Sequence, residues 1–317
     1  MIRSSSETRL REWVVFAGVL GLTVCMCVAS ASAAPQTGCE QTAQLMQKSC
    51  TQESRADFLL ALAKAANLPT MMERSEAIDE AREELEEARE ECSEQKEARL
   101  DLCDLLGEDF YHPDTDPANF DAPVANPYFP LTPGVTRTYE GETEDGIETV
   151  VVIVTDETRE IDGVECTVVL DIGYLDGEPV EETLDYFAYD NLGNAWYFGE
   201  DSFEIEDGLI SSTDGSWIAG EDGAKPGIVM PATPTVGITD RQEMLLGEAE
   251  DAATVISVDD EVSVPYGDFV NVVQTMDFTP IEPEGFEYKF HAAGVGTIKE
   301  VDSESGEELV LISVEVE

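Results

Sequence analysis

Two patterns of hydrophobic and polar residues divide the chain, and one gives way to the other near residue 135. Before this point, small and apolar residues recur every three or four positions, as at Ile78, Ala81 and Leu85. This period is that of a helix face. After it, apolar and polar residues alternate in short segments between turn dipeptides such as Asp162-Gly163, as in antiparallel strands. We therefore predict an α+β fold, with an N-terminal helical hairpin followed by an antiparallel all-β domain.

Four cysteines predict how the two helices pair. Cys39 and Cys50 are eleven residues apart, as are Cys92 and Cys103, and eleven residues rise about 16 Å along a helix. A disulfide needs Cα atoms within roughly 7 Å of each other, so neither pair can bond within its own helix. A single antiparallel register allows only Cys39–Cys103 with Cys50–Cys92. These four are the site residues that we assign, and they make a disulfide-stapled hairpin from helices with little core of their own.

The centre of that register coincides with a turn. Its midpoint is residue 71, just after Asn67-Leu68-Pro69-Thr70. Asn67 can end the first helix, Pro69 stops its continuation, and Thr70 with Glu73 forms a capping box for the second helix. The arrangement resembles the twin-cysteine helical hairpins, a structural class with many roles. The resemblance therefore implies a shape and no activity.

The chain is predicted to have four segments. They are a signal peptide (1–33), the helical hairpin (34–106), a Pro-rich connector (107–134) and the β domain (135–317). The signal peptide has basic residues, an apolar stretch and a cleavage site at Ala31-Ser32-Ala33. We expect a periplasmic or extracellular protein, where disulfides persist, with no membrane span once the signal is removed. The aromatic residues of the connector predict that it lies against the β domain.

The β domain is predicted to be a meander of about ten strands, folded as a curved sheet, a half-barrel or a sandwich. The stretch 212–240 is rich in Gly and Pro and predicts a long loop. We place strands at 136–142, 147–156, 165–173, 180–189, 195–205, 250–258, 261–265, 270–278, 286–291, 295–301 and 307–316.

Two motifs near the C-terminus carry a resemblance. Val264-Pro265-Tyr266-Gly267-Asp268-Phe269 precedes a strand, and Ala293-Gly294-Val295-Gly296-Thr297-Ile298-Lys299 follows later. They resemble signatures of secreted bacterial β-domain proteins, mostly uncharacterised, some of which are similar to the LolA/LolB-like half-barrels that carry lipoproteins. In such carriers a helix covers the concave face, and here only the N-terminal hairpin could take that place. In physical terms, Pro and Gly make a hairpin corner, Phe269 fills the core and the two glycines permit a bulge.

The charge of the chain excludes two kinds of partner. There are 17 basic and 69 acidic residues, a formal net charge of −52. Nucleic acid and anionic membrane surfaces need clustered cations and are disfavoured. Three interpretations of the acidity stay open: a solvated surface, binding of several calcium ions, and docking to a basic partner.

Residues typical of catalysis are scarce. The only histidines are His112, expected on the surface, and His291, expected partly buried in a strand. Neither follows a nucleophile motif, and Cys166 is expected to be a buried, inert thiol. We predict no catalytic, cofactor-binding or metal-binding residue, and no enzyme. The paired carboxylates Glu181-Glu182 and Asp259-Asp260-Glu261 leave a carboxylate-based hydrolase as a remote alternative. Structural calcium is considered at two oxygen-rich segments, Asp190 to Asn194 and Asp114 to Asp121, for which a turn and a solvated connector are favoured.

Aromatic residues on two neighbouring strands bear on function. Trp196, Tyr197 and Phe198 are expected to lie across a short turn from Tyr186, Phe187 and Tyr189, and we favour a solid core over a cavity. The function that we predict is an exported, non-enzymatic binding module for an unknown partner, with an apolar small molecule or lipid as the candidate ligand. The alternative is a structural protein of the cell envelope that binds a protein partner through the hairpin.

Overall fold

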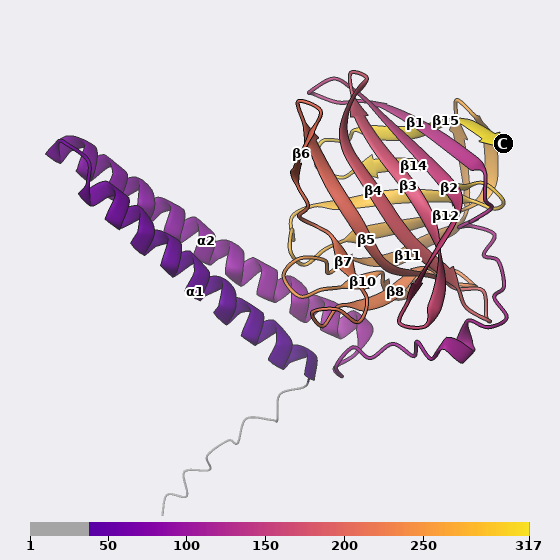
Figure 1. Ribbon diagram of the computed structural model, residues 1–317. Helices are drawn as coiled ribbons and strands as arrows, with labels where there is room; N and C mark the ends of the chain where they lie inside the picture. Colours follow the sequence, from indigo (N-terminus) through magenta and orange to yellow (C-terminus); the bar gives the residue numbers. More distant parts are fainter. Residues whose placement is uncertain (1–37, 317) are drawn as a thin grey trace, which may run out of the picture. The chain divides into compact units, whose positions relative to one another are not determined.

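The computed structural model describes residues 38–316, which comprise a helical hairpin, a connector and a 15-stranded antiparallel sheet (Figure 1). The predicted signal peptide at 1–33 lies outside the described residues. Among the described helices, none combines the length and the apolar character needed to cross a membrane.

The hairpin confirms the prediction from the cysteines. Helix α1 (Gly38–Ala66) and helix α2 (Met71–Leu106) run antiparallel. Disulfides join Cys39 to Cys103 and Cys50 to Cys92, each with a Cα–Cα distance of 5.8 Å. Cys50 lies eleven residues after Cys39 and Cys92 lies eleven residues before Cys103, so both bonds belong to one helix–helix register.

The turn between the helices also has the predicted chemistry. The Thr70 hydroxyl accepts a hydrogen bond from the Glu73 N–H at 3.2 Å, and the Glu73 carboxylate accepts one from the Thr70 N–H at 3.0 Å. The Asn67 side chain donates to the Ala63 carbonyl at 2.8 Å. These bonds satisfy backbone groups that helix ends leave free. They need no tertiary contact, which explains why the turn could be predicted from local sequence.

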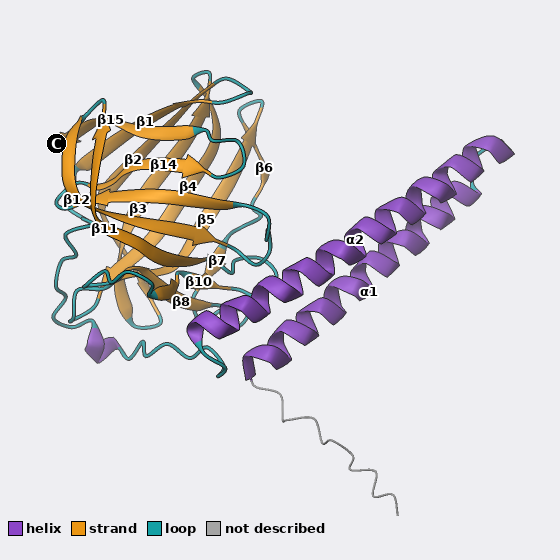
Figure 2. Ribbon diagram, turned by 180° about the vertical axis from the view of Figure 1, so that it is seen from behind, coloured by secondary structure: helices purple, strands orange, loops and turns teal. Residues whose placement is uncertain are grey.

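The sheet runs in the order β10-β8-β5-β4-β3-β2-β1-β15-β14-β13-β12-β11-β9, with β6 and β7 pairing to β5. It curves strongly, so that β2–β5 cross β11–β14, in front of them in Figure 1 and behind them in Figure 2. The strands are β1 (Val135–Glu142), β2 (Ile147–Ile161), β3 (Val164–Leu175), β4 (Glu178–Tyr189), β5 (Ala195–Glu206), β6 (Leu209–Ser212), β7 (Trp217–Ile218), β8 (Lys225–Met230), β9 (Thr239–Arg241), β10 (Glu243–Met244), β11 (Ala252–Val264), β12 (Gly267–Phe278), β13 (Phe286–Ala292), β14 (Gly296–Asp302) and β15 (Glu308–Val316).

The two ends of this open sheet are linked by one short segment. Strand β9 pairs with β11, and β10, which follows it after Gln242 alone, pairs with β8. The chain passes so close to β8 that a Cβ atom at Gly227 would overlap the carbonyl oxygen of Arg241. Glycine is therefore required there for space. This link holds the curved sheet around its concave side.

Two strand predictions were wrong. The stretch 212–240 is not a single loop, because it contains β7, β8 and most of β9. These strands are only two to six residues long, so their local pattern is weak. The predicted strands 250–258 and 261–265 are one strand, β11, interrupted by register shifts between Val255 and Glu261. The β11–β12 corner at Pro265-Tyr266 has the predicted character, whereas the register shift between β13 and β14 falls at Ile298 and not at the two glycines.

The connector lies against the sheet, as its aromatic residues predicted. The Phe120 ring meets the ring of Phe198 edge-on with centroids 5.5 Å apart, and the Phe129 ring meets that of Phe187 at 4.9 Å. The side-chain amide of the buried Asn126 donates hydrogen bonds to the carbonyls of Gly193, at 2.9 Å, and of Met230, at 3.2 Å. The packed aromatic rings and the hydrogen-bonded Asn126 amide both favour an ordered connector.

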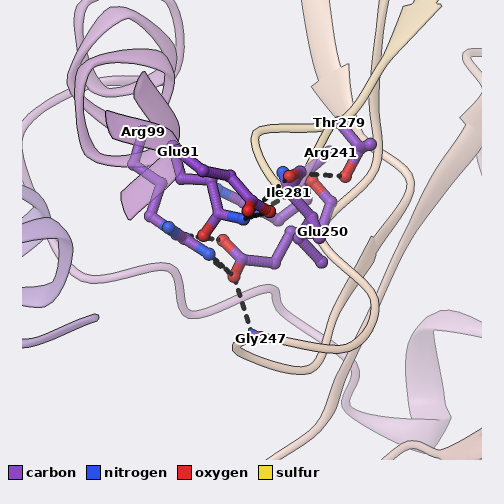
Figure 3. Close-up of polar contacts among 8 residues, drawn as sticks. Glu91, Arg99, Arg241, Gly247, Glu250, Thr279 and Ile281 are labelled. Carbon is purple, nitrogen blue, oxygen red and sulfur yellow. Dashed lines mark hydrogen bonds and ion pairs between the residues drawn. The ribbon is translucent and has the colours of Figure 1, made fainter. Parts of the chain in front are cut away.

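One buried ion pair joins the hairpin to the β domain (Figure 3). Arg99 of α2 donates from Nη2 to Glu250 Oε1 at 2.6 Å and from Nε to Oε2 at 2.9 Å. The same carboxylate accepts the Gly247 N–H at 2.8 Å. Arg99 and Glu250 are only 6% and 1% exposed. Because both charges are removed from water, each depends on the other.

Candidate functional site

A cavity of about 580 Å³ lies on the concave side of the sheet. Strands from both halves of the sheet line it, and the connector contributes Phe129, Pro130 and Leu131. No lining residue belongs to the hairpin, so the hairpin does not take the place of the covering helix of a half-barrel carrier. The volume is in the range of ordinary small-molecule sites.

Alternation along the strands separates the aromatic residues between two faces. Tyr186, Trp196 and Phe198 belong to a buried core on the face turned away from the cavity. Phe187 and Tyr197 line the cavity and stack on each other with ring centroids 4.7 Å apart. The expectation of a solid core was therefore wrong for two of these six residues, because successive strand residues point to opposite faces.

One wall of the cavity is apolar. Val154, Val169 and Phe187 form a buried cluster, against which Phe129 and Val229 pack. All five line the cavity. Apolar surface beside open volume favours a ligand with an apolar part.

The remaining lining is strongly acidic. Only two Lys or Arg residues, Arg137 and Lys289, line the cavity. Arg137 donates hydrogen bonds to the carbonyls of Val295 at 2.7 Å and Pro130 at 3.1 Å, so its guanidinium is bonded to the backbone and not to a cavity acid. Nine carboxylates face the same space: Glu148, Asp171, Glu181, Asp185, Glu200, Glu243, Asp251, Asp277 and Glu300.

Burial and mutual repulsion raise the pKa values of these carboxyl groups. The pKa of Asp171 rises to about 8, first through burial and then through the negative charges of Asp185 and Glu300. Burial also raises the pKa of Asp185 to about 7, although the Tyr197 hydroxyl donates to it at 2.6 Å. The pKa of Glu200 rises to about 7, again mainly through burial. Burying one carboxylate beside others favours its protonated form.

Lys289 and His291 lie among these acids on β13. The negative charge of Glu300 raises the pKa of Lys289, which also lies 3.4 Å from the Glu287 carboxylate. His291 is buried, and burial lowers its pKa to about 4, so it is neutral at physiological pH. Its Nδ1 lies 3.2 Å from the Thr297 hydroxyl. One lysine cannot neutralise nine acids, and the cavity keeps an excess of negative potential.

Glu243 is the most enclosed of the cavity acids. It is 8% exposed, and burial followed by the charge of Asp251 raises its pKa. The Trp217 indole lies near both Glu200 and Glu243, but its Nε1 has no hydrogen-bond partner within the described part of the chain.

The remaining sequence candidates lie elsewhere. Of the paired carboxylates, only Glu181 lines the cavity, and Asp259 is exposed on β11. His112 is exposed, as predicted. Cys166 is a free, fully buried thiol whose pKa burial raises to about 12. At this pKa the nucleophilic thiolate is scarce near neutral pH.

The Asp190 carboxylate stabilises the turn that follows it by accepting hydrogen bonds from the turn's own residues. Asp190 accepts four hydrogen bonds, from the N–H groups of Leu192 and Asn194 and from the side chains of Asn194 and Trp196. Burial would raise its pKa, but these bonds outweigh burial and lower it. The four disulfide cysteines lie in the hairpin, away from the cavity. Among residues 38–316, no group of three His, Cys, Asp or Glu residues has an arrangement that could hold a metal ion.

The cavity acids make stability depend on pH in an unusual direction. Asp171 has a higher pKa in the folded chain than the ordinary 3.8. The folded state therefore binds the proton more tightly, and this contribution to stability is full below about pH 4 and is lost as pH rises through about 8. We expect the free energy of unfolding of the wild type to fall between pH 5 and 9. Asp171→Asn should raise it at pH 9 by on the order of 1–2 kcal/mol, after allowance for solvent screening, and change it little at pH 5.

Urea denaturation at several pH values measures this effect. Asp156→Asn is the matched control, since Asp156 is exposed on the neighbouring strand β2 and its substitution removes the same charge. If Asp156→Asn stabilises the protein at pH 9 as much as Asp171→Asn does, the effect comes from net charge and not from the cavity.

The cavity acids were missed in the sequence, although a weak signal exists. Asp171 interrupts the apolar run from Val168 to Ile172, and Asp185 interrupts Leu184-Asp185-Tyr186. A carboxylate inside an apolar strand is costly unless it faces a solvated space. In a chain with 69 acidic residues, this signal is hidden among surface acids.

Comparison with known proteins adds little to this picture. No protein-family model matches the chain, and no curated protein matches it significantly. One similar solved structure is a Bacteroides fragilis protein described as exported, with a YmcC-like fold. It has 14% identity and a TM-score of 0.33, and the match covers 60% of this chain and 100% of that one. Another, from Parabacteroides distasonis, is described as a lipoprotein, with 11% identity, a TM-score of 0.34 and coverage of 61% and 100%. Neither is described as a carrier of the LolA or LolB type, and likeness at these scores assigns no function.

Proposed function

We propose that this chain is an exported, non-enzymatic module that binds a small organic cation with an apolar part in the concave cavity. Its two disulfides suit an oxidising compartment outside the cytosol. The observation that carries the proposal is the division of the cavity between an apolar wall and nine carboxylates. A neutral lipid would leave the ionised acids without counter-charge, and we therefore propose an amphiphilic, cationic ligand in place of the apolar one expected from the sequence.

The two parts of such a ligand would have distinct partners. Its apolar group would pack on Val154, Val169 and Phe187, where burial stabilises by about 25 cal/mol per Å². Its ammonium group would approach the carboxylates of Asp185 and Glu200, which repel each other when the cavity is without a cation. A bound cation relieves this repulsion and favours the ionised acids.

Three dansyl probes that differ in charge test the proposal: cationic dansylcadaverine, neutral dansylamide and anionic dansylglycine. We expect dansylcadaverine to bind about tenfold or more tightly than dansylamide, equivalent to about 1.4 kcal/mol, and dansylglycine not to bind. The affinity for dansylcadaverine should increase from pH 6 to 8.5. The reason is that Asp185, Glu200 and Asp171 ionise over this range. Fluorescence titration measures all three affinities.

Two acids of β4 that lie three residues apart provide the matched variants. Asp185 lines the cavity, whereas Glu182 is exposed and does not. Asp185→Asn should weaken dansylcadaverine binding, and Glu182→Gln, which removes the same charge, should not. Equal binding of the three probes, or equal loss in both variants, would contradict the proposal.

The hydrolase alternative was based on Glu181-Glu182 and Asp259-Asp260-Glu261, of which only Glu181 lines the cavity, but other cavity carboxylates could be considered for it. A carboxyl group with a pKa near 7 suits a general acid, and Asp185 and Glu200 have such values. We favour binding because mutual burial of many acids already accounts for these values, without an assigned acid–base pair. Turnover of a panel of glycoside substrates would decide for the hydrolase.

A second candidate function belongs to the hairpin. Leu59, Leu60, Met71 and Met72 lie near its turn and are each more than half exposed. Such exposed apolar side chains are available to a protein partner that would cover them. This function would occupy a different part of the chain from the cavity and is compatible with ligand binding there.

A further inference from the structure

A second cavity, of about 240 Å³, lies between the base of the hairpin, the start of the connector and β8–β10. Its lining includes three basic residues, Arg99, Lys225 and Arg241, together with His112. Such a gathering of cations is unexpected in a chain with a formal net charge of −52.

The scarcity of cations makes their placement informative. From residue 125 to the C-terminus the chain has only six Lys or Arg residues, and two of them, Lys225 and Arg241, line this cavity. Arg159, Lys289 and Lys299 each have a carboxylate oxygen within 4.0 Å. Within the described residues, Lys225 and Arg241 form no such ion pair, although acids outnumber bases four to one across the chain.

Arg241 is nine-tenths buried, and its guanidinium makes fewer hydrogen bonds than it could. It is 9% exposed, and its Nε has no hydrogen-bond partner among residues 38–316. Its Nη1 donates to the Glu250 carbonyl at 3.4 Å, and its Cζ lies 5.5 Å from the centre of the Tyr111 ring. A buried guanidinium with an unused donor costs free energy unless a further acceptor is supplied.

Lys225 lies close to Arg241 and has no anionic partner either. Its ammonium donates to the Tyr111 carbonyl and lies 3.5 Å from His112 Nδ1. Burial lowers the pKa of Lys225, and the positive charge of Arg241 lowers it further. Burial is also the main cause that lowers the pKa of Arg241. Both cations are thus less stable here than in water, and a bound anion would reverse this.

The acids near the cavity do not satisfy these two cations. The Glu250 carboxylate already accepts hydrogen bonds from Nε and Nη2 of Arg99 and from the Gly247 N–H. Glu108 and Asp109 line the cavity but are exposed. Arg99 is therefore neutralised, whereas the charges of Lys225 and Arg241 remain available.

We propose that this second cavity binds a small oxyanion, a phosphate or carboxylate group, between Lys225 and Arg241. A guanidinium and an ammonium together match the several acceptor oxygens of such a group. The volume admits a phosphate with a few waters, since a water occupies about 30 Å³. The anion would join β8 to β9 through two groups that otherwise repel each other.

Inorganic phosphate and acetate, added to the full chain, test this site, with sodium chloride at matched ionic strength as the reference. We expect phosphate to raise the Tm above the chloride reference and its phosphorus NMR line to broaden with protein. Lys225→Gln should weaken phosphate binding about tenfold, as expected for the loss of one charged hydrogen-bond donor. A response to acetate as well as phosphate would identify a carboxylate as a possible source of the oxyanion.

Lys299→Gln is the matched control. Lys299 lies on β14 and pairs with Glu308, so its substitution removes an equal charge away from this cavity. It should leave phosphate binding unchanged, and Arg241→Gln should weaken binding as Lys225→Gln does. The site does not exist as proposed if phosphate acts no differently from chloride, or if Lys299→Gln weakens binding as much as Lys225→Gln.

Discussion

Arg99→Met should lower the free energy of unfolding by about 3–5 kcal/mol, the usual cost of leaving one partner of a buried ion pair without the other. Glu250 is 1% exposed and would keep only the Gly247 N–H as a donor. Because this pair lies between the hairpin and the β domain, the loss should appear as weaker docking of the two. Urea denaturation followed by tryptophan fluorescence and by far-ultraviolet circular dichroism measures it.

The same helix supplies a control for this prediction. Arg82 pairs with Asp79 at 2.8 Å, but both side chains are more than 60% exposed. Arg82→Met should cost at most about 1 kcal/mol, since surface ion pairs contribute little. The double variant Arg99→Met/Glu250→Gln should recover much of the loss, because it removes the buried charge. Equal effects of Arg99→Met and Arg82→Met would show that burial of the pair does not matter.

Cys50→Ser/Cys92→Ser should destabilise the hairpin by about 4 kcal/mol, as expected for a disulfide that closes a loop of this size. The hairpin has a thin core: between the Cys50–Cys92 bond and the turn, its buried apolar residues are Ala65 and Ala81. We expect its helical circular dichroism signal to be lost at a lower temperature than the β-domain signal. Wild-type protein in which both disulfides are reduced should behave similarly.

Ligand binding separates this effect from general unfolding. No hairpin residue lines the large cavity, so the disulfide variant should bind dansylcadaverine with unchanged affinity while its hairpin is destabilised. A hairpin that melts at the same temperature with and without the Cys50–Cys92 bond would contradict the prediction.

The ion pair shows why some of the site could not be predicted from sequence. Arg99 lies seven residues after Cys92 and four before Cys103, on the disulfide face of α2. This spacing is a local hint that Arg99 is buried. Its partner Glu250 is 151 residues away along the chain, among many acids of similar appearance. Only docking of the hairpin selects Glu250 among them.

The cavity has a similar origin. Alternation predicted which residues of a strand share a face, but a strand does not reveal which face will be concave. Asp171 and Asp185 come together with Glu300 because strands from both halves of one curved sheet surround the same space. The link through β9 and β10, which pair with β11 and β8, lies at the end of the stretch predicted as a loop and just after it, where no strand was predicted.

By itself, the sequence determined the elements whose information is local. The cysteine spacing and the Thr70 capping box specified both disulfides and the hairpin turn, because helix geometry ties a residue to neighbours at known distances. Strand alternation specified an antiparallel β domain. Tertiary structure alone decided where charges meet: nine acids around one cavity, and Lys225 with Arg241 around another. Electrostatic environments depend on distances in space, and these arise only when the curved sheet brings remote strands together.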